Sequence, residues 1–157
     1  MYSRVLIPLD GSEVAEAALP LIEGIAAPLG LEVVLVRVVL PHSRDLIGVP
    51  AAVAEDERVA RLREAKRYLE GLAATLGERG VRATAQVRVG APPAEIVAAA
   101  IETGADLIAM TTHGRSGLGR LLFGSVAESV LRGAPIPVIL LRPTGAAARA
   151  ARDEAHA

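Results

Sequence analysis

The sequence predicts an α/β fold: a doubly wound, open five-stranded parallel sheet in the order 3-2-1-4-5, with helices on both faces. Five short apolar runs rich in β-branched residues alternate with four helix-like segments. Four glycines, Gly30, Gly80, Gly104 and Gly133, each end a helix-like stretch just before such a run. This alternation favours a parallel sheet, because parallel strands need crossover connections and the connecting helices then cover both faces.

The five expected strands differ in polarity, and the difference indicates their places in the sheet. The runs at residues 4–9, 31–40 and 105–110 are continuously apolar, as in strands that are buried on both faces. The run at 81–89 alternates with polar side chains, which indicates an edge. The run at 134–141 contains two prolines, and proline within a sheet is confined largely to edges. With these two strands outside, the order 3-2-1-4-5 follows.

Four helices are expected between the strands. The first begins near Ser12, a good N-cap, and two glutamates in its first turn complement the helix dipole. The longest spans residues 54–78, with apolar residues at helical spacing among glutamates and arginines. The third opens with Pro92-Pro93 and the fourth opens at Gly124-Ser125, both of which are typical helix starts.

The chain of 157 residues fits one domain, and with 52% hydrophobic and 22% charged residues it is too apolar to be disordered. We expect that domain to span residues 1–143, with a loop at 41–50 between the second strand and the longest helix. The alanine-rich tail at 144–157 has no apolar face, and we expect it to fray.

Composition excludes several classes of function. The net charge of −1 provides no global field that would attract nucleic acid or an anionic membrane, and no stretch reaches the roughly 20 apolar residues of a membrane span. The absence of cysteine excludes disulfides, zinc–thiolate sites and thiol nucleophiles, and we expect a cytoplasmic protein. The single lysine, Lys66, follows no glycine, which excludes a Walker A phosphate loop. Aromatic residues make up only 2%, so base-stacking and flavin sites are disfavoured.

Two unusual loops converge on one place in the predicted fold. Ligands of open α/β sheets bind beyond the carboxyl ends of the strands where the strand order reverses, here between the first and fourth strands. The loops that leave these strands are residues 8–12 and the glycine-rich 111–119. The second leads to a helix start at Gly124-Ser125, where free amides can bind an anion, and Arg115 and Arg120 can neutralise phosphate. The glycine spacing alone is equally typical of ordinary turns.

Four segments make a resemblance specific. The stretches PLDGSE at 8–13, MTTHG at 110–114, GSVAE at 124–128 and PIPV at 135–138 resemble the universal stress protein family over the whole predicted domain. ATP-binding members of that family carry the pattern G-x2-G-x9-G-[S/T] after the fourth strand. Here Gly114, Gly124 and Ser125 match this pattern, whereas Thr111 stands at the first glycine.

The resemblance implies a dimeric stress-response regulatory module that binds ATP, with AMP also possible and Mg²⁺ or Mn²⁺ on the phosphates, and that hydrolyses ATP slowly at most. It implies contacts to the nucleoside from the first loop and to adenine from backbone groups at the end of the second strand. It also implies site residues at the exit of the fourth strand, and a phosphate cradle in the loop that follows and at the helix start. The residues carried over are Pro8, Leu9, Asp10, Val38, Met110, Thr111, Gly114, Arg115, Gly124, Ser125 and Val126.

The resemblance also implies a homodimer through the last strand, Ile136 to Leu141, which the family pairs antiparallel across a two-fold axis. The dense apolar run in this strand agrees, because an exposed apolar edge is normally covered or used. No nucleic acid or membrane partner is expected. An unknown protein partner remains open.

Alternative interpretations stay open for several of these residues. Thr111 either adds a hydroxyl contact or closes the pocket, which would make the chain a structural or partner-binding stress protein that does not bind ATP. An adenine-nucleotide hydrolase or transferase is a third hypothesis. Asp10 either contacts nucleotide or Mg²⁺ or forms an Asx-turn. His113 has no acidic neighbour to orient it and is interpreted as shaping its loop. A receiver domain is rejected because Arg142 stands where its lysine belongs.

Overall fold

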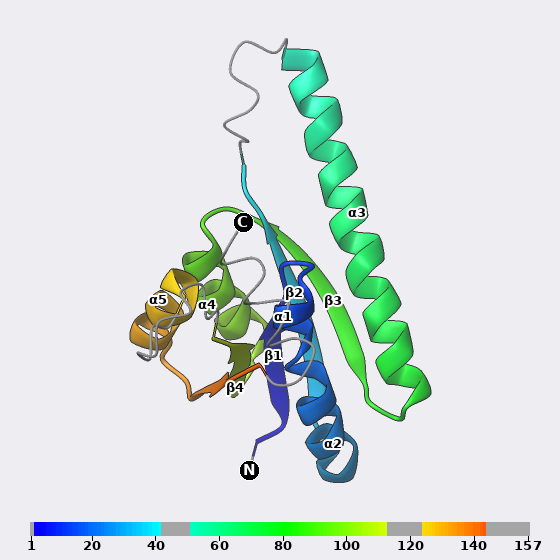
Figure 1. Ribbon diagram of the computed structural model, residues 1–157, viewed down its shortest axis with the longest axis vertical. Coiled ribbons are helices and arrows are strands. Elements are labelled where there is room, and N and C mark those ends of the chain that lie inside the picture. Colours follow the sequence, from blue (N-terminus) through cyan, green and yellow to red (C-terminus); the bar gives the residue numbers. More distant parts are fainter. Residues whose placement is uncertain (1, 42–50, 113–123, 144–157) are drawn as a thin grey trace.

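Five parallel strands form one sheet in the order β3-β2-β1-β4-β5 in the computed structural model, which describes residues 2–41, 51–112 and 124–143 (Figure 1). This arrangement confirms the predicted fold class and strand order. Both strands that were expected at the edges, β3 and β5, lie there. The strands are β1 (Arg4–Pro8), β2 (Glu32–Val39), β3 (Ala83–Val89), β4 (Leu107–Thr111) and β5 (Val138–Leu141).

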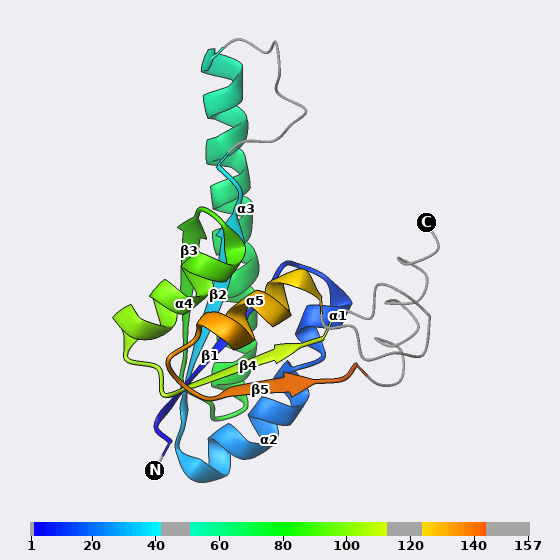
Figure 2. The same cartoon turned by 90° about the vertical axis from the view of Figure 1, so that its left-hand side faces the viewer.

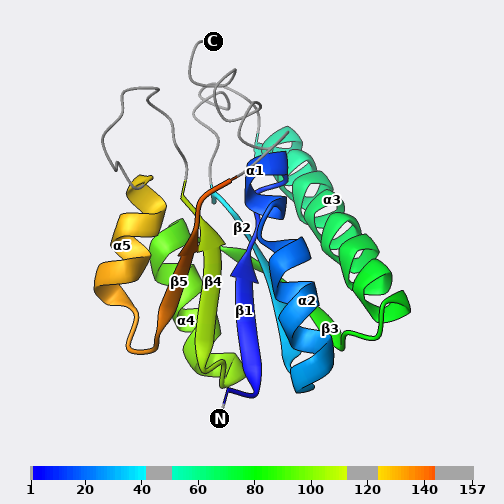
Figure 3. The same ribbon diagram turned by 60° about the horizontal axis from the view of Figure 1, so that its bottom comes forward.

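Helices cover both faces of this sheet (Figure 3). On one face, α2 and α3 pack with the short α1 on a buried cluster that includes Val5, Ile7 and Leu35. On the other face, α4 and α5 pack on a cluster that includes Leu6 and Ile108. Consecutive strand residues thus enter opposite clusters, which explains why the central strands are continuously apolar. The helices are α1 (Glu13–Glu16), α2 (Leu19–Leu29), α3 (Ala51–Glu78), α4 (Pro92–Thr103) and α5 (Ser125–Gly133).

The longest helix, α3, extends well beyond the end of the sheet at its amino-terminal part (Figure 2). It has 28 residues and begins at Ala51, earlier than the expected residue 54, because alanines favour helix continuation. None of the helices in the described ranges combines the length and the apolar character needed to cross a lipid bilayer.

The first predicted helix is divided into two helices. Ser12 caps α1 as expected, with its hydroxyl 3.1 Å from the amide nitrogen of Ala15. The helix stops at Glu16, however, and α2 starts at Leu19 with Pro20 in its first turn. Proline has no amide hydrogen and clashes with the preceding turn inside a helix, whereas it is tolerated in the first turn. A single helix through Pro20 is therefore disfavoured.

The last strand is shorter than predicted, and its prolines lie before it. β5 begins at Val138, after Pro135 and Pro137, which cannot donate to a sheet. The carbonyl of Pro137 still accepts a hydrogen bond from the amide of Ile108 at 3.0 Å. Gly133 also differs from the other predicted helix-ending glycines. Gly30, Gly80 and Gly104 have positive φ values of 65°, 81° and 65°, whereas α5 ends with Ala134 in extended conformation.

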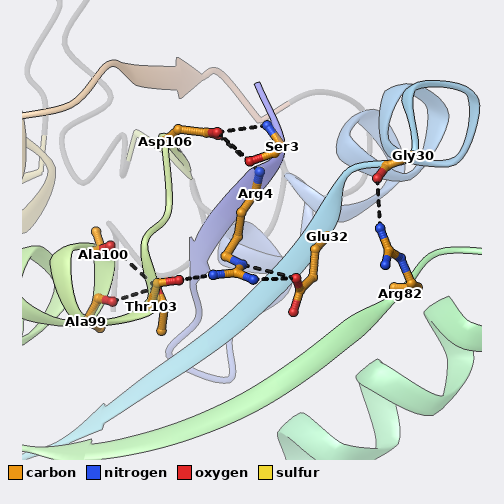
Figure 4. Close-up of polar contacts among 9 residues, drawn as sticks. All are labelled: Ser3, Arg4, Gly30, Glu32, Arg82, Ala99, Ala100, Thr103 and Asp106. Carbon is orange, nitrogen blue, oxygen red and sulfur yellow. Dashed lines mark hydrogen bonds and ion pairs between the residues drawn. The ribbon is translucent and has the colours of Figure 1, made fainter. Parts of the chain in front are cut away.

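A polar cluster joins the amino ends of the strands (Figure 4). The carboxylate of Asp106 accepts hydrogen bonds from the amide and hydroxyl of Ser3, both at 2.8 Å, and from the amide of Arg4 at 3.1 Å. The guanidinium of Arg4 pairs with Glu32 at 2.7 Å and donates to the carbonyl of Thr103. These contacts connect β1, β2 and β4 at the amino ends of the strands, opposite their carboxyl ends.

Burial opposes ionisation of Asp106, but the hydrogen bonds from Ser3 and from the Arg4 amide outweigh it and hold its pKa below the ordinary value. The carboxylate therefore contributes to stability in its charged form.

Candidate functional site

A cavity of about 680 Å³ lies at the carboxyl ends of β1, β2 and β4, where the strand order reverses. Sites for small molecules usually measure about 300–1,000 Å³, so its size suits a ligand such as a nucleotide. The described residues that line it are Pro8, Leu9, Asp10, Gly11, Ser12, Ala15, Val36, Val38, Pro92, Ile96, Met110, Thr111, Gly124, Ser125, Val126 and Ala127.

This cavity brings together every predicted site residue that the structure describes. They come from the β1–α1 loop, from the ends of β2 and β4, and from the start of α5. The members are Pro8, Leu9, Asp10, Val38, Met110, Thr111, Gly124, Ser125 and Val126. Gly114 and Arg115 lie outside the described residues, as do His113 and Arg120.

Part of the lining was not predicted from the sequence. Val36 precedes Val38 by two residues in β2 and therefore shares its face, a signal that strand periodicity contains. Ser12 and Ala15 follow from the start of α1. Pro92 and Ile96 at the start of α4 had no comparable signal, because their place depends on how α4 crosses the sheet.

One wall of the cavity is apolar. It is lined by Val36, Ile96 and Met110, which belong to the cluster beneath α4 and α5, and by Val38, which packs against that cluster. Aliphatic side chains of this kind can hold a flat apolar group without aromatic stacking.

The β1–α1 loop forms a polar rim. Oδ1 of Asp10 accepts hydrogen bonds from the amide and the hydroxyl of Ser12 at 2.9 and 2.6 Å. These contacts are those of an Asx-turn, so the structural interpretation of Asp10 is confirmed. Gly11 has a φ of +88°, a conformation that favours glycine. The turn also places Asp10 in the wall of the cavity, so it retains its candidate role toward a ligand.

The start of α5 supplies the second polar element. Gly124 is the N-cap, and no side chain among the described residues caps the helix. Free amides and the helix dipole make such a terminus favourable for an anion. Gly124, Ser125 and Val126 all line the cavity.

Two charged groups outside the described lining of the cavity form surface ion pairs. Glu128 pairs with Arg132 on the surface of α5 at 2.7 Å, and Lys66 pairs with Glu70 on α3 at 3.7 Å. Asp10 is the only carboxylate among the described lining residues. Within the described ranges, no group of three or more histidine, aspartate or glutamate side chains lies together as a metal site requires.

Comparison with known proteins agrees with this fold. The family model of the Universal stress protein family matches residues 1–142. Universal stress protein MJ0577 of Methanocaldococcus jannaschii is 32% identical over 155 residues, covering 90% of this chain and 96% of that protein. The solved structure of MJ0577 has a TM-score of 0.78 at 31% identity, and the match covers 93% of this chain and 99% of that one.

Two further solved structures hold nucleotides. A universal stress protein in complex with cAMP has a TM-score of 0.61 at 26% identity, covering 91% of this chain and 98% of that one. The universal stress protein from Archaeoglobus fulgidus in complex with dAMP has a TM-score of 0.63 at 26% identity, covering 88% and 97%. The family match spans the whole described sheet and its helices, and the chain belongs to the universal stress protein family.

Proposed function

We propose that this chain is a cytoplasmic stress-response regulatory module that binds an adenine nucleotide, with ATP as the principal ligand and AMP as a shorter one. The observation that carries the proposal is the cavity at the switch point, where an aliphatic wall faces a polar rim and a helix start. The relatives solved with cAMP and dAMP support the choice of an adenine nucleotide.

In this proposal each part of the cavity has a role. The aliphatic wall around Val38 and Met110 holds adenine, and the backbone at Val38 pairs with its polar edge. Asp10 accepts a hydrogen bond from the ribose. The amides of Ser125 and Val126 face the phosphates at the start of α5.

A divalent cation, Mg²⁺ or Mn²⁺, fits this site only if the phosphates of the nucleotide supply most of its oxygen contacts. Mg²⁺ is commonly bound through one or two carboxylates together with phosphate oxygens, and Asp10 is the carboxylate in the described lining. When bound, the cation neutralises phosphate charge.

The described lining favours binding over rapid turnover. It contains no lysine, arginine or histidine that would stabilise a phosphoryl group in transfer. We therefore expect ATP hydrolysis to be slow at most.

The cavity also favours this function over a closed pocket. Thr111 lies in the wall of a cavity that retains about 680 Å³, so its side chain does not fill the space. The alternative, a partner-binding stress protein without nucleotide, requires that it does.

Isothermal titration of the full chain with ATP and Mg²⁺, and separately with AMP, tests the proposal. We expect saturable binding that Asp10→Asn weakens, because the amide keeps the turn acceptor but loses the charge. Asp10→Ala also breaks the turn and should weaken binding further. Absence of heat with both nucleotides, together with no nucleotide in the purified protein, would defeat the proposal.

We also propose a homodimer through β5. The strand is an edge of the sheet, and its apolar residues Val138 to Leu141 are only half-buried. The carbonyl of Pro137 accepts from Ile108 of β4 and that of Leu141 accepts from Thr112 just after it. The backbone groups of Val138 and Leu140 therefore point away from the sheet. They are available to pair with a second copy.

A further inference from the structure

Arg37 interrupts the apolar run of β2 close to the ligand cavity. It is the only charged residue between Val33 and Leu40 in the sequence. Val33 and Leu35 are fully buried in the cluster beneath α2 and α3, and strand alternation gives Arg37 the next position on that face. Its side chain is only 19% exposed. An aliphatic residue would extend the core here, and burying a guanidinium has a cost, so packing alone does not explain the arginine.

The guanidinium of Arg37 supports the turn of the β1–α1 loop. If Gly11 carried a Cβ atom, the three nearest atoms among the described residues would be Cζ, Nη1 and Nη2 of Arg37, each at 3.5 Å. In this turn Asp10 accepts its hydrogen bonds from Ser12, and both residues line the ligand cavity. The guanidinium therefore lies directly against the middle of the polar rim.

Two residues of α3 fix the guanidinium in its turn. It pairs with Glu64 and lies over the ring of Tyr68. A second cavity, of about 250 Å³, is lined by Asp10 of the turn, by Glu64 of α3 and by Arg37. Because this space adjoins both the turn and α3, the side chain of Arg37 is the group that connects them.

We infer that Arg37 is a positioning residue for the ligand site: it holds the turn from Asp10 to Ser12 in the conformation that receives the nucleotide, and it links that turn to α3. This inference rests on the proposed function, in which Asp10 accepts a hydrogen bond from the ribose. A turn that is fixed before the ligand arrives loses less conformational entropy on binding, so the affinity is higher. Arg37 is not among the described residues that line the ligand cavity, so it acts through the turn.

Titrations of Arg37→Met with AMP and with adenosine test the inference. Methionine keeps an unbranched side chain and removes the planar charged group. We expect the dissociation constant for AMP to rise about three- to tenfold, because the turn must then be ordered when the ligand binds. Adenosine should lose the same factor, because the turn acts on the ribose. A loss confined to AMP would mean that the charge of Arg37 attracts the phosphate, which contradicts a positioning role.

A double-mutant cycle with Asp10→Ala tests whether Arg37 acts through the turn. Once the carboxylate of Asp10 has been removed, Arg37→Met should weaken AMP binding no further. Losses that add in the double variant would show that Arg37 acts independently of Asp10, and the inference would then be wrong.

The matched control is Arg4→Met. Arg4 also pairs with a glutamate, Glu32, at 2.7 Å, but it lies at the amino ends of the strands. This variant should lower the melting temperature and leave both dissociation constants unchanged. A purely structural Arg37 would behave in the same way, so the two variants distinguish a positioning role from a structural one.

Hydrogen exchange of the free protein reports on the turn directly. The amides of Ser12 and Ala15 donate to Asp10 and to the Ser12 hydroxyl at 2.9 and 3.1 Å, so their exchange is slowed while the turn is formed. Arg37→Met should speed exchange at both amides, and Arg4→Met at neither.

The link to α3 is tested by Tyr68→Leu, which removes the ring beneath the guanidinium. It should also speed exchange at Ser12 and Ala15, because Arg37 then loses part of its support. Unchanged exchange in this variant would show that α3 does not act on the turn.

Two results would overturn the inference while the proposed function stands: Arg37→Met that binds AMP and adenosine as tightly as the native protein, or Arg37→Met with native exchange at Ser12 and Ala15. If the native protein binds neither ligand, the proposed function fails. Hydrogen exchange then still decides whether Arg37 holds the turn.

Discussion

The guanidinium of Arg37 lies over the ring of Tyr68, with its Cζ atom 5.2 Å from the ring centroid. The same guanidinium pairs with Glu64 of α3 at 3.2 Å. A Cβ atom on Gly11 would lie 3.5 Å from it, so Arg37 also packs against the β1–α1 loop. One side chain of β2 therefore connects the longest helix to the loop that forms the polar rim of the cavity.

Replacing Arg37 tests this connection. Arg37→Lys keeps the charge but loses the planar face, so we expect a loss of about 0.5–1 kcal/mol in the free energy of unfolding. Urea unfolding measures it. Lys66→Gln, in an exposed ion pair at 3.7 Å, is the control and should change stability by less than about 0.5 kcal/mol. If Arg37→Lys has the same free energy of unfolding as the native protein, the planar contact does not contribute to stability.

Tyr68 should affect stability at alkaline pH. Burial, aided by its hydrogen bond of 2.7 Å to Glu16, raises the pKa of its hydroxyl. The tyrosine hydroxyl ionises at about pH 10 in the unfolded chain and at a higher pH in the folded protein. The stability that the protonated hydroxyl contributes is therefore fully present below about pH 10 and is lost progressively as the pH rises further. Tyr68→Phe should be about 1 kcal/mol less stable at neutral pH. Between about pH 9 and pH 11, the free energy of unfolding of Tyr68→Phe should fall less steeply than that of the native protein. Parallel curves in urea unfolding would contradict this.

Asp106 should affect stability on the acid side. Its pKa is lowered in the folded protein, so its contribution is present above the pKa of the unfolded chain, about 3.9, and is lost as the pH falls through the folded value. Asp106→Asn should be about 1 kcal/mol less stable than the native protein at neutral pH. Thermal unfolding should show this difference unchanged down to about pH 5 and shrinking below about pH 4. A constant difference across that range would exclude the charge as its cause.

Two glycines should respond to alanine with opposite signs. A Cβ atom on Gly90, whose φ is +154°, would lie 2.7 Å from Cγ of Glu95, a residue that pairs with Arg88 at 2.7 Å. Gly90→Ala should therefore cost about 2 kcal/mol. Gly71 lies in α3 with open space around it, and Gly71→Ala should stabilise the protein by about 0.5–1 kcal/mol. Calorimetry measures the melting temperature of both variants. If both variants melt higher than the native protein, or both melt lower, this interpretation is wrong.

The proposed dimer depends on the outward backbone of β5. Leu140→Pro removes an amide that points away from β4, so the contacts within the sheet are retained while pairing with a second copy is blocked. Light scattering should show a native dimer and a monomeric variant at micromolar concentration. Leu29→Lys, at an exposed leucine on α2, should remain dimeric. A native monomer under these conditions removes the proposal.

The fold was predictable because its signals are local or topological. Apolar runs that are buried on both faces identify the central strands, and the prolines near β5 indicate an edge. The strand order alone then locates the switch point, so Pro8, Asp10 and Ser125 were placed without any side-chain geometry. Details that depend on packing were not accessible. Pro92 and Ile96 reach the cavity only through the path of α4 across the sheet.

Some sequence signals had two valid interpretations, and geometry retained both. Asp10 forms the Asx-turn and also lines the cavity. Pro20, by contrast, was not recognised from the sequence as a helix break, although its missing amide hydrogen suits the first turn of α2.

The polar cluster around Asp106 lies at the amino ends of the strands, whereas the cavity lies at their carboxyl ends. A substitution at a polar lining residue such as Asp10 can therefore alter ligand preference without touching this cluster. The apolar lining differs, because Val36, Ile96 and Met110 also belong to the buried core. Ligand selectivity can thus diverge among copies of this fold most freely at the polar part of the lining.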